Sequence, residues 1–165
     1  MITTRGSTLA RSVPAILAGP AMIGAALGWS EGLSALFTRA VALPAVAVGV
    51  AALMVPALYI GAAFIGVAPR AQAVTRSTSA ALKDMGVLFL GLSPSLLFLV
   101  AASTGTGTVR VLGHLVVGVG VVLGLRGLFT RLFDQRSMKA LGLFLCWSLV
   151  TVGIGAQLFT RTIPL

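Results

Sequence analysis

The stretch from Ala40 to Ala68 reads AVALPAVAVGVAALMVPALYIGAAFIGVA, 29 residues without a charged side chain. A helix needs about 20 apolar residues to cross a hydrocarbon core of about 30 Å. A second uncharged run of 21 residues extends from Ala140 to Thr160. In lipid, backbone amides must find their partners within the segment, and an α-helix provides them. Both runs therefore predict membrane-spanning helices.

The chain as a whole is too apolar for a water-soluble globule. Apolar residues make up 58% of its 165 positions and charged residues only 9%, which leaves too little polar surface to coat a domain of this size. We therefore expect one integral membrane domain over residues 1–165, an all-α, polytopic transmembrane helix bundle of five spans. The predicted spans are 13–29, 40–68, 85–102, 111–125 and 140–160.

The first of these segments differs from the other four. It is short, rich in Ala and Gly, and interrupted by Pro14 and Pro20. The sequence leaves three interpretations open: a full span, a segment that dips into the bilayer, or a signal peptide behind Arg5 and Arg11.

The distribution of Lys and Arg predicts the orientation, because cytoplasmic flanks of spans are enriched in both residues. If 13–29 crosses, nine cations lie on one side and three on the other, whereas without that crossing the division is seven against five. We therefore predict a cytoplasmic N-terminus and an external or periplasmic C-terminus. The preference for Arg over Lys and the abundance of Ala and Gly are typical of high-GC bacteria, which indicates a bacterial inner membrane.

The net charge of +9 is spread between the apolar runs and forms no basic block. Nucleic-acid binding needs cations clustered on a solvated face, so we expect anionic lipid headgroups as the counterpart. From Leu125 onward the fourth segment becomes amphipathic, which predicts a helix that leaves the bilayer and lies along the headgroups. The predicted cytoplasmic cations are Arg70, Arg76, Lys83, Arg126, Arg131, Arg136 and Lys139. They could contact lipid or a partner protein, or they could only anchor the topology, and the sequence favours neither interpretation.

Small residues recur four positions apart in the apolar segments. Such pairs let two transmembrane helices approach closely, so that dispersion contacts hold them together. The pairs Gly24 with Gly28 and Gly120 with Gly124 are the candidate helix-packing sites, and Gly28 with Gly32 and Ala45 with Gly49 have the same spacing.

Pro94 lies between Ser93 and Ser95 in the third predicted span. Proline removes a backbone donor and bends a helix. One interpretation is a polar path around a transported solute. The other is a packed kink whose serines bond back to their own helix, and we favour it.

Residues for catalysis are scarce. The chain has one His and one Cys. Its three acidic residues, Glu31, Asp84 and Asp134, all lie outside the apolar runs. Neither an acid–base pair nor a metal triad can be assembled from them within the bilayer, so we expect no enzyme, no metal and no cofactor. His114 is the one candidate haem ligand, and it would need a second ligand from a partner. We expect instead a hydrogen-bonded or interfacial His114, and a small buried apolar side chain at Cys146.

The predicted layout has five spans, short loops and a cytoplasmic N-terminus. The third span is preceded by Lys83-Asp84-Met85-Gly86, which leads into Leu92-Ser93-Pro94. This layout and this stretch resemble the Yip1-like membrane proteins, including their bacterial members. The resemblance covers most of the chain in topology and carries over no functional residue. It implies a non-enzymatic membrane organiser or adaptor. We expect a protein that acts by binding, as a scaffold, an adaptor or a small subunit of a larger assembly, with a membrane protein or a second copy as its partner. A channel or facilitator for a small solute and a haem-bearing redox subunit are the alternatives.

Overall fold

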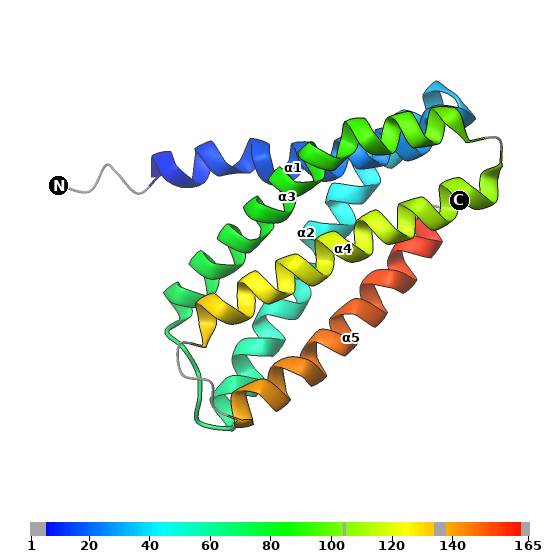
Figure 1. Ribbon diagram of the computed structural model, residues 1–165. Coiled ribbons are helices and arrows are strands. Elements are labelled where there is room, and N and C mark those ends of the chain that lie inside the picture. The colour runs from blue at the N-terminus through cyan, green and yellow to red at the C-terminus, as the bar shows by residue number, and fades with distance from the viewer. Residues whose placement is uncertain (1–5, 104, 134–137, 163–165) are drawn as a thin grey trace.

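The computed structural model describes residues 6–103, 105–133 and 138–162, which form helices joined by short connections (Figure 1). In chain order the elements are α1 (Gly6–Gly28), the short 3-10 helix η1 (Trp29–Glu31), α2 (Leu33–Phe64), α3 (Ala71–Ala102), α4 (Thr106–Leu132) and α5 (Met138–Thr162). No strand occurs in the described ranges, and the predicted all-α bundle is confirmed. Four helices, α2 to α5, are long and apolar enough to cross a membrane. That the segment 13–29 crosses as well stays a prediction.

Glycines define both ends of α2. Gly32 precedes the helix with φ 106°, and Gly66 follows it with φ 73°, a left-handed region that side chains with a Cβ rarely adopt. After the last turn, the amides of Gly66 and Val67 donate to the carbonyls of Ala63 and Ala62, which satisfies acceptors that would otherwise lack a partner. Because an α-helix rises about 1.5 Å per residue, the length of α2, which has 32 residues, exceeds the thickness of the hydrocarbon core.

The helices are joined laterally in the order α5, α2, α1, α3, α4. Helix α1 packs against α2 and α3, while α3 packs against α4 and α2 against α5. Figure 1 shows the N-terminal half of α1 extending past α3, away from the other helices. Helices α4 and α5 make few contacts with each other, so the four helices α2 to α5 do not close into a tightly packed ring.

Two apolar clusters hold the bundle at its two ends. At one end, side chains of α1, α2 and α3 pack with the start of α4 and the end of α5, around Ile23, Leu27 and Phe89. The other cluster lies where α2 and α4 end and α3 and α5 begin, around Leu132 and Phe144. This second end, near Arg70 and Lys139, is called the basic end below.

Two helices begin before the spans predicted within them. The connection predicted over 69–84 is largely helical, because α3 begins at Ala71. The apolar run marks only the part of a helix that lies at lipid depth, whereas a polar segment of good helix formers continues the helix beyond it. In the same way, the predicted outer connection over 30–39 is helical from Leu33 onward.

The amphipathic end of α4 also differs from expectation. The helix continues without interruption to Leu132, and Leu128, Leu132 and Phe133 are buried in the basic-end cluster. Its apolar face therefore packs against other helices of the same chain, and not against lipid headgroups. An amphipathic pattern predicts which face is covered, but does not identify what covers it.

Candidate functional site

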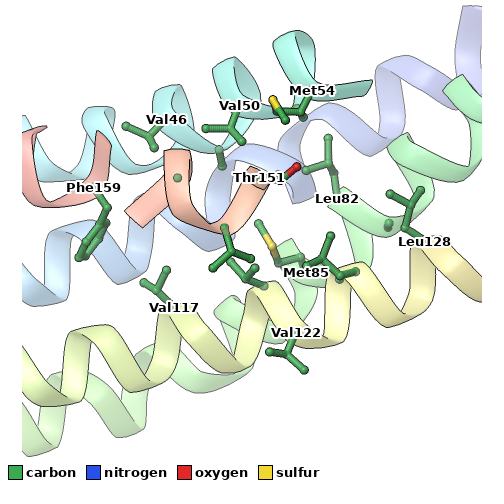
Figure 2. Close-up of a pocket in the computed structure, with 18 of the residues that line it drawn as sticks. Val46, Val50, Met54, Leu82, Met85, Val117, Val122, Leu128, Thr151 and Phe159 are labelled. Carbon is green, nitrogen blue, oxygen red and sulfur yellow. The ribbon is translucent and has the colours of Figure 1, made fainter. Parts of the chain in front are cut away.

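A cavity of about 340 Å³ lies between α2, α3, α4 and α5. Its size falls within the range of about 300–1,000 Å³ that is common for ligand pockets. Figure 2 shows Val46 and Val50 of α2, Met85 of α3, Val117 of α4 and Phe159 of α5 around it. The cavity exists because α4 and α5 are separated along the middle of their length while α2 and α3 form the opposite wall.

Aromatic contacts join α4 to α5 toward both ends of this cavity. At the basic end, Phe129 of α4 lies 5.0 Å from Phe144 of α5 between ring centroids, and Phe144 lies 5.4 Å from Trp147. At the other end, the rings of His114 on α4 and Phe159 on α5 meet edge to face with centroids 5.3 Å apart. Helices α4 and α5 are thus bridged at two levels, with the cavity between the two bridges.

The side between α4 and α5 is open. Every lining residue of α2 and α3 is buried or half-buried, whereas all the exposed lining residues belong to α4 or α5. Val122 of α4 is 63% exposed and Val152 of α5 is 43% exposed, although both also line the cavity. In a membrane this opening would face the acyl chains of the bilayer.

The lining is almost entirely carbon. Its hydroxyl groups are those of Thr78 and Thr151, and His114 is its titratable residue. Thr151 donates a hydrogen bond to the carbonyl of Trp147, 2.8 Å away. Thr78 Oγ1 is buried and has no hydrogen-bond partner among the described residues. Such a surface suits an apolar guest, because a bound water needs about two to four polar partners.

The Ser93-Pro94-Ser95 motif lies on α3 outside the cavity lining. Pro94 has no amide proton to donate to the carbonyl of Leu90, four residues earlier. The hydroxyl of Ser93 donates to that carbonyl at 2.9 Å, and Ser93 is buried. Pro94 and Ser95 are exposed on the other side of the helix. The Ser93 hydroxyl therefore satisfies the carbonyl that Pro94 leaves without a donor, and none of the three residues lines the cavity.

The four candidate packing glycines all lie at helix contacts. A Cβ built on Gly24 would fall 2.1 Å from the carbonyl oxygen of Arg39, and one on Gly28 would fall 2.6 Å from the Cα of Leu36. On α4, a Cβ on Gly120 would lie 2.2 Å from the Phe89 ring, whereas one on Gly124 would be in ordinary contact with Met85. Gly49 and Gly32 have nothing within 4 Å of such an atom.

The described cations of the predicted cytoplasmic group are all exposed: Arg70, Arg76, Lys83, Arg126, Arg131 and Lys139. Arg131 forms an ion pair with Asp84 at 2.5 Å, a contact that contributes little to stability because both partners are exposed. Arg136 lies outside the described residues.

Cys146, expected to be buried, is exposed on α5.

No protein-family model, curated protein or solved structure matches the chain. The case for a function therefore rests on the chemistry of its own residues. Among the described residues, no group of three His, Cys, Asp or Glu side chains is placed to hold a metal ion.

Two polar contacts of the bundle do not follow from the sequence patterns. Arg39, one of the three cations on the predicted external side, is 5% exposed and pairs with Glu31 at 2.6 Å. The indole Nε1 of Trp147 donates to the carbonyl of Met54 at 2.7 Å and joins α5 to α2. The signal in the sequence is the position of Arg39 directly before the longest uncharged run, eight residues after the carboxylate of Glu31.

Proposed function

We propose that this chain is a non-enzymatic multi-pass membrane protein that acts by binding another membrane protein, as a scaffold, an adaptor or a small subunit of a larger assembly. The observation that carries the proposal is a strip of small side chains on α2, formed by Ala45, Gly49 and Ala52. The three residues are four and three positions apart, which places them on one face of the helix. All three are exposed, and a Cβ added at Gly49 would meet nothing within 4 Å.

Small residues are the means by which this chain brings its own helices together. Gly19 lets α1 approach the backbone of Gly86 on α3, and Gly24 lets it approach α2. The strip on α2 offers the same geometry on the face turned away from the cavity, with Val48 and Leu53 exposed beside it. In lipid, close approach at small residues is a main source of helix association, so a transmembrane helix of the partner is the expected occupant.

The proposed location is a bacterial inner membrane with the basic end in the cytoplasm. Its support is the accumulation of exposed cations at that end, where they would meet anionic headgroups. In this orientation the C-terminus is periplasmic, and a crossing of the membrane by 13–29 would place the N-terminus in the cytoplasm. The resemblance to Yip1-like proteins stays a prediction, and it implies the same non-enzymatic role.

Affinity purification from native membranes in mild detergent tests the proposal. We expect a membrane protein to co-purify in a fixed ratio, and Gly49→Leu to remove it because the added side chain fills the strip. Ala57→Leu is the matched control, because Ala57 is exposed on a different side of α2. Loss of the partner with both variants, or with neither, would overturn the assignment of this face.

Solute flux into reconstituted vesicles and the visible spectrum test the alternative functions. We expect no flux that depends on Ser93, since its hydroxyl is occupied within α3. Flux of a small solute that Ser93→Leu or Ser95→Leu abolishes would replace the scaffold proposal by a channel. A Soret band lost in His114→Ala would replace it by a haem-bearing subunit.

A further inference from the structure

We propose that the cavity between α2, α3, α4 and α5 holds one acyl chain of an anionic phospholipid, which enters through the opening between α4 and α5. The site is distinct from the strip on α2, which lies on the opposite face of that helix, and the inference does not depend on the proposed function. Its basis is the position of the opening, the chemistry of the lining and the charge beside the entrance.

The opening selects the class of guest. It lies between Val122 and Val152, near the middle of α4 and α5. At this depth the surroundings of a membrane protein are hydrocarbon tails. An unfilled cavity would deprive its lining atoms of dispersion contacts, and a carbon surface offers water too few partners. A lipid tail would supply these dispersion contacts without bringing any polar group into the cavity.

A ridge on α4 connects the opening to the charged surface. Gly118, Val122 and Arg126 are spaced four residues apart and therefore lie along one side of the helix. Gly118 and Val122 both line the cavity and are exposed. Arg126 continues the ridge one turn nearer the basic end and is exposed as well. A lipid whose tail enters between α4 and α5, beside Gly118 and Val122, would hold its phosphate near this guanidinium.

The charge at the basic end favours an anionic headgroup. The described residues at this end of the bundle include one carboxylate, Asp84, and six cations: Arg70, Arg76, Lys83, Arg126, Arg131 and Lys139. Asp84 is itself paired with Arg131. Guanidinium groups bind phosphate by two parallel hydrogen bonds, and each cation near an anionic membrane surface adds to the attraction.

Quenching of tryptophan fluorescence by brominated lipid tests the inference directly. Trp147 lines the cavity, and Trp29→Phe leaves it as the sole tryptophan of the chain. The protein would be reconstituted into zwitterionic phosphatidylcholine with small amounts of phosphatidylglycerol brominated along its tails. We expect quenching of Trp147 to saturate at a low mole fraction, and to need several-fold more lipid when brominated phosphatidylcholine replaces the anionic lipid.

Two glycines on α5 provide matched variants. Gly155 lines the cavity, whereas Gly153 does not, and a Cβ added at either position would meet nothing within 4 Å. Gly155→Leu fills the cavity and should abolish the saturable quenching, whereas Gly153→Leu should leave it intact. Arg126→Gln should remove the preference for the anionic lipid, whereas Arg76→Gln should retain it.

Several results would overturn the inference. Quenching that rises linearly with brominated lipid, is equal for both headgroups, or persists in Gly155→Leu would show that Trp147 reports only the surrounding bilayer. Absence of quenching together with a dimeric elution volume would assign the cavity to a second copy of the chain. Circular dichroism and size-exclusion chromatography establish that each variant is folded, and Gly153→Leu carries the comparison because it adds the same side chain to the same helix.

Discussion

The guanidinium of Arg39 donates a hydrogen bond to the carbonyl of Leu27 at 2.7 Å, so α2 covers the C-terminal end of α1. The last carbonyls of a helix have no partner within it, and a cation is favoured there by the helix dipole. A second nitrogen of the same guanidinium reaches the carboxylate of Glu31, which lies in the connection between the two helices. One side chain therefore fixes the hairpin of α1 and α2.

Replacing Arg39 by Met should weaken this hairpin. The substitution keeps much of the side-chain volume but leaves the buried Leu27 carbonyl without this donor. We expect the free energy of unfolding in detergent micelles to fall by about 1–3 kcal/mol, the usual cost of an unsatisfied buried acceptor. Arg161→Met removes the same charge from an exposed position and should change stability by less than about 0.5 kcal/mol. Equal losses in both variants would argue for net charge, and not the hairpin contact, as the cause.

Gly24→Ala tests the close approach of α1 to α2. The new Cβ would lie 2.1 Å from the Arg39 carbonyl oxygen, a backbone atom that cannot rotate away. We expect a loss of about 1–3 kcal/mol, typical of overpacking, measured by the same unfolding assay. Gly153→Ala is the control, because its Cβ would enter open space and the better helix propensity of Ala should stabilise by about 0.5–1 kcal/mol. A neutral Gly24→Ala would mean that the two helices are further apart than described here.

The four long apolar helices and the packing glycines could be predicted from the sequence because both follow from local patterns. The uncharged run from Ala40 determines a helix wherever the chain meets lipid, and four-residue spacing places Gly24 beside Gly28 on one face. The start of α3 at Ala71 was not predictable in this way, since a helix that continues into water no longer needs apolar residues.

The cavity could not be predicted because it results from side chains of four helices that come together only in the folded chain. Val122 and Val152 are ordinary apolar residues in their own segments, and nothing in the spacing of either shows that they flank the same opening. The same holds for Trp147, whose acceptor Met54 lies 93 residues earlier. Sequence patterns indicate that a face is apolar, whereas packing decides whether it meets a helix, a lipid or a cavity.

Trp147→Phe should separate the contribution of the indole hydrogen bond from that of aromatic packing. The phenyl ring keeps the contact with the Phe144 ring, but it lacks the indole N–H that donates to the Met54 carbonyl. We expect a loss of about 0.5–1.5 kcal/mol for this bond, against about 3–5 kcal/mol for Trp147→Ala. Trp29→Phe is the matched control, because Trp29 is 57% exposed and its replacement should be nearly neutral. If Trp147→Phe is neutral as well, the hydrogen bond makes no net contribution.

Ser93 and Pro94 should be energetically coupled. In the native chain the Ser93 hydroxyl donates to the Leu90 carbonyl, which proline leaves without its helical donor. In Pro94→Ala the new amide can donate there, so the hydroxyl becomes dispensable. A double-mutant cycle measured by unfolding in micelles should therefore show that Ser93→Ala costs about 0.5–1.5 kcal/mol more beside Pro94 than beside Ala. Additive effects of the two substitutions would show that the hydroxyl does not replace the missing amide.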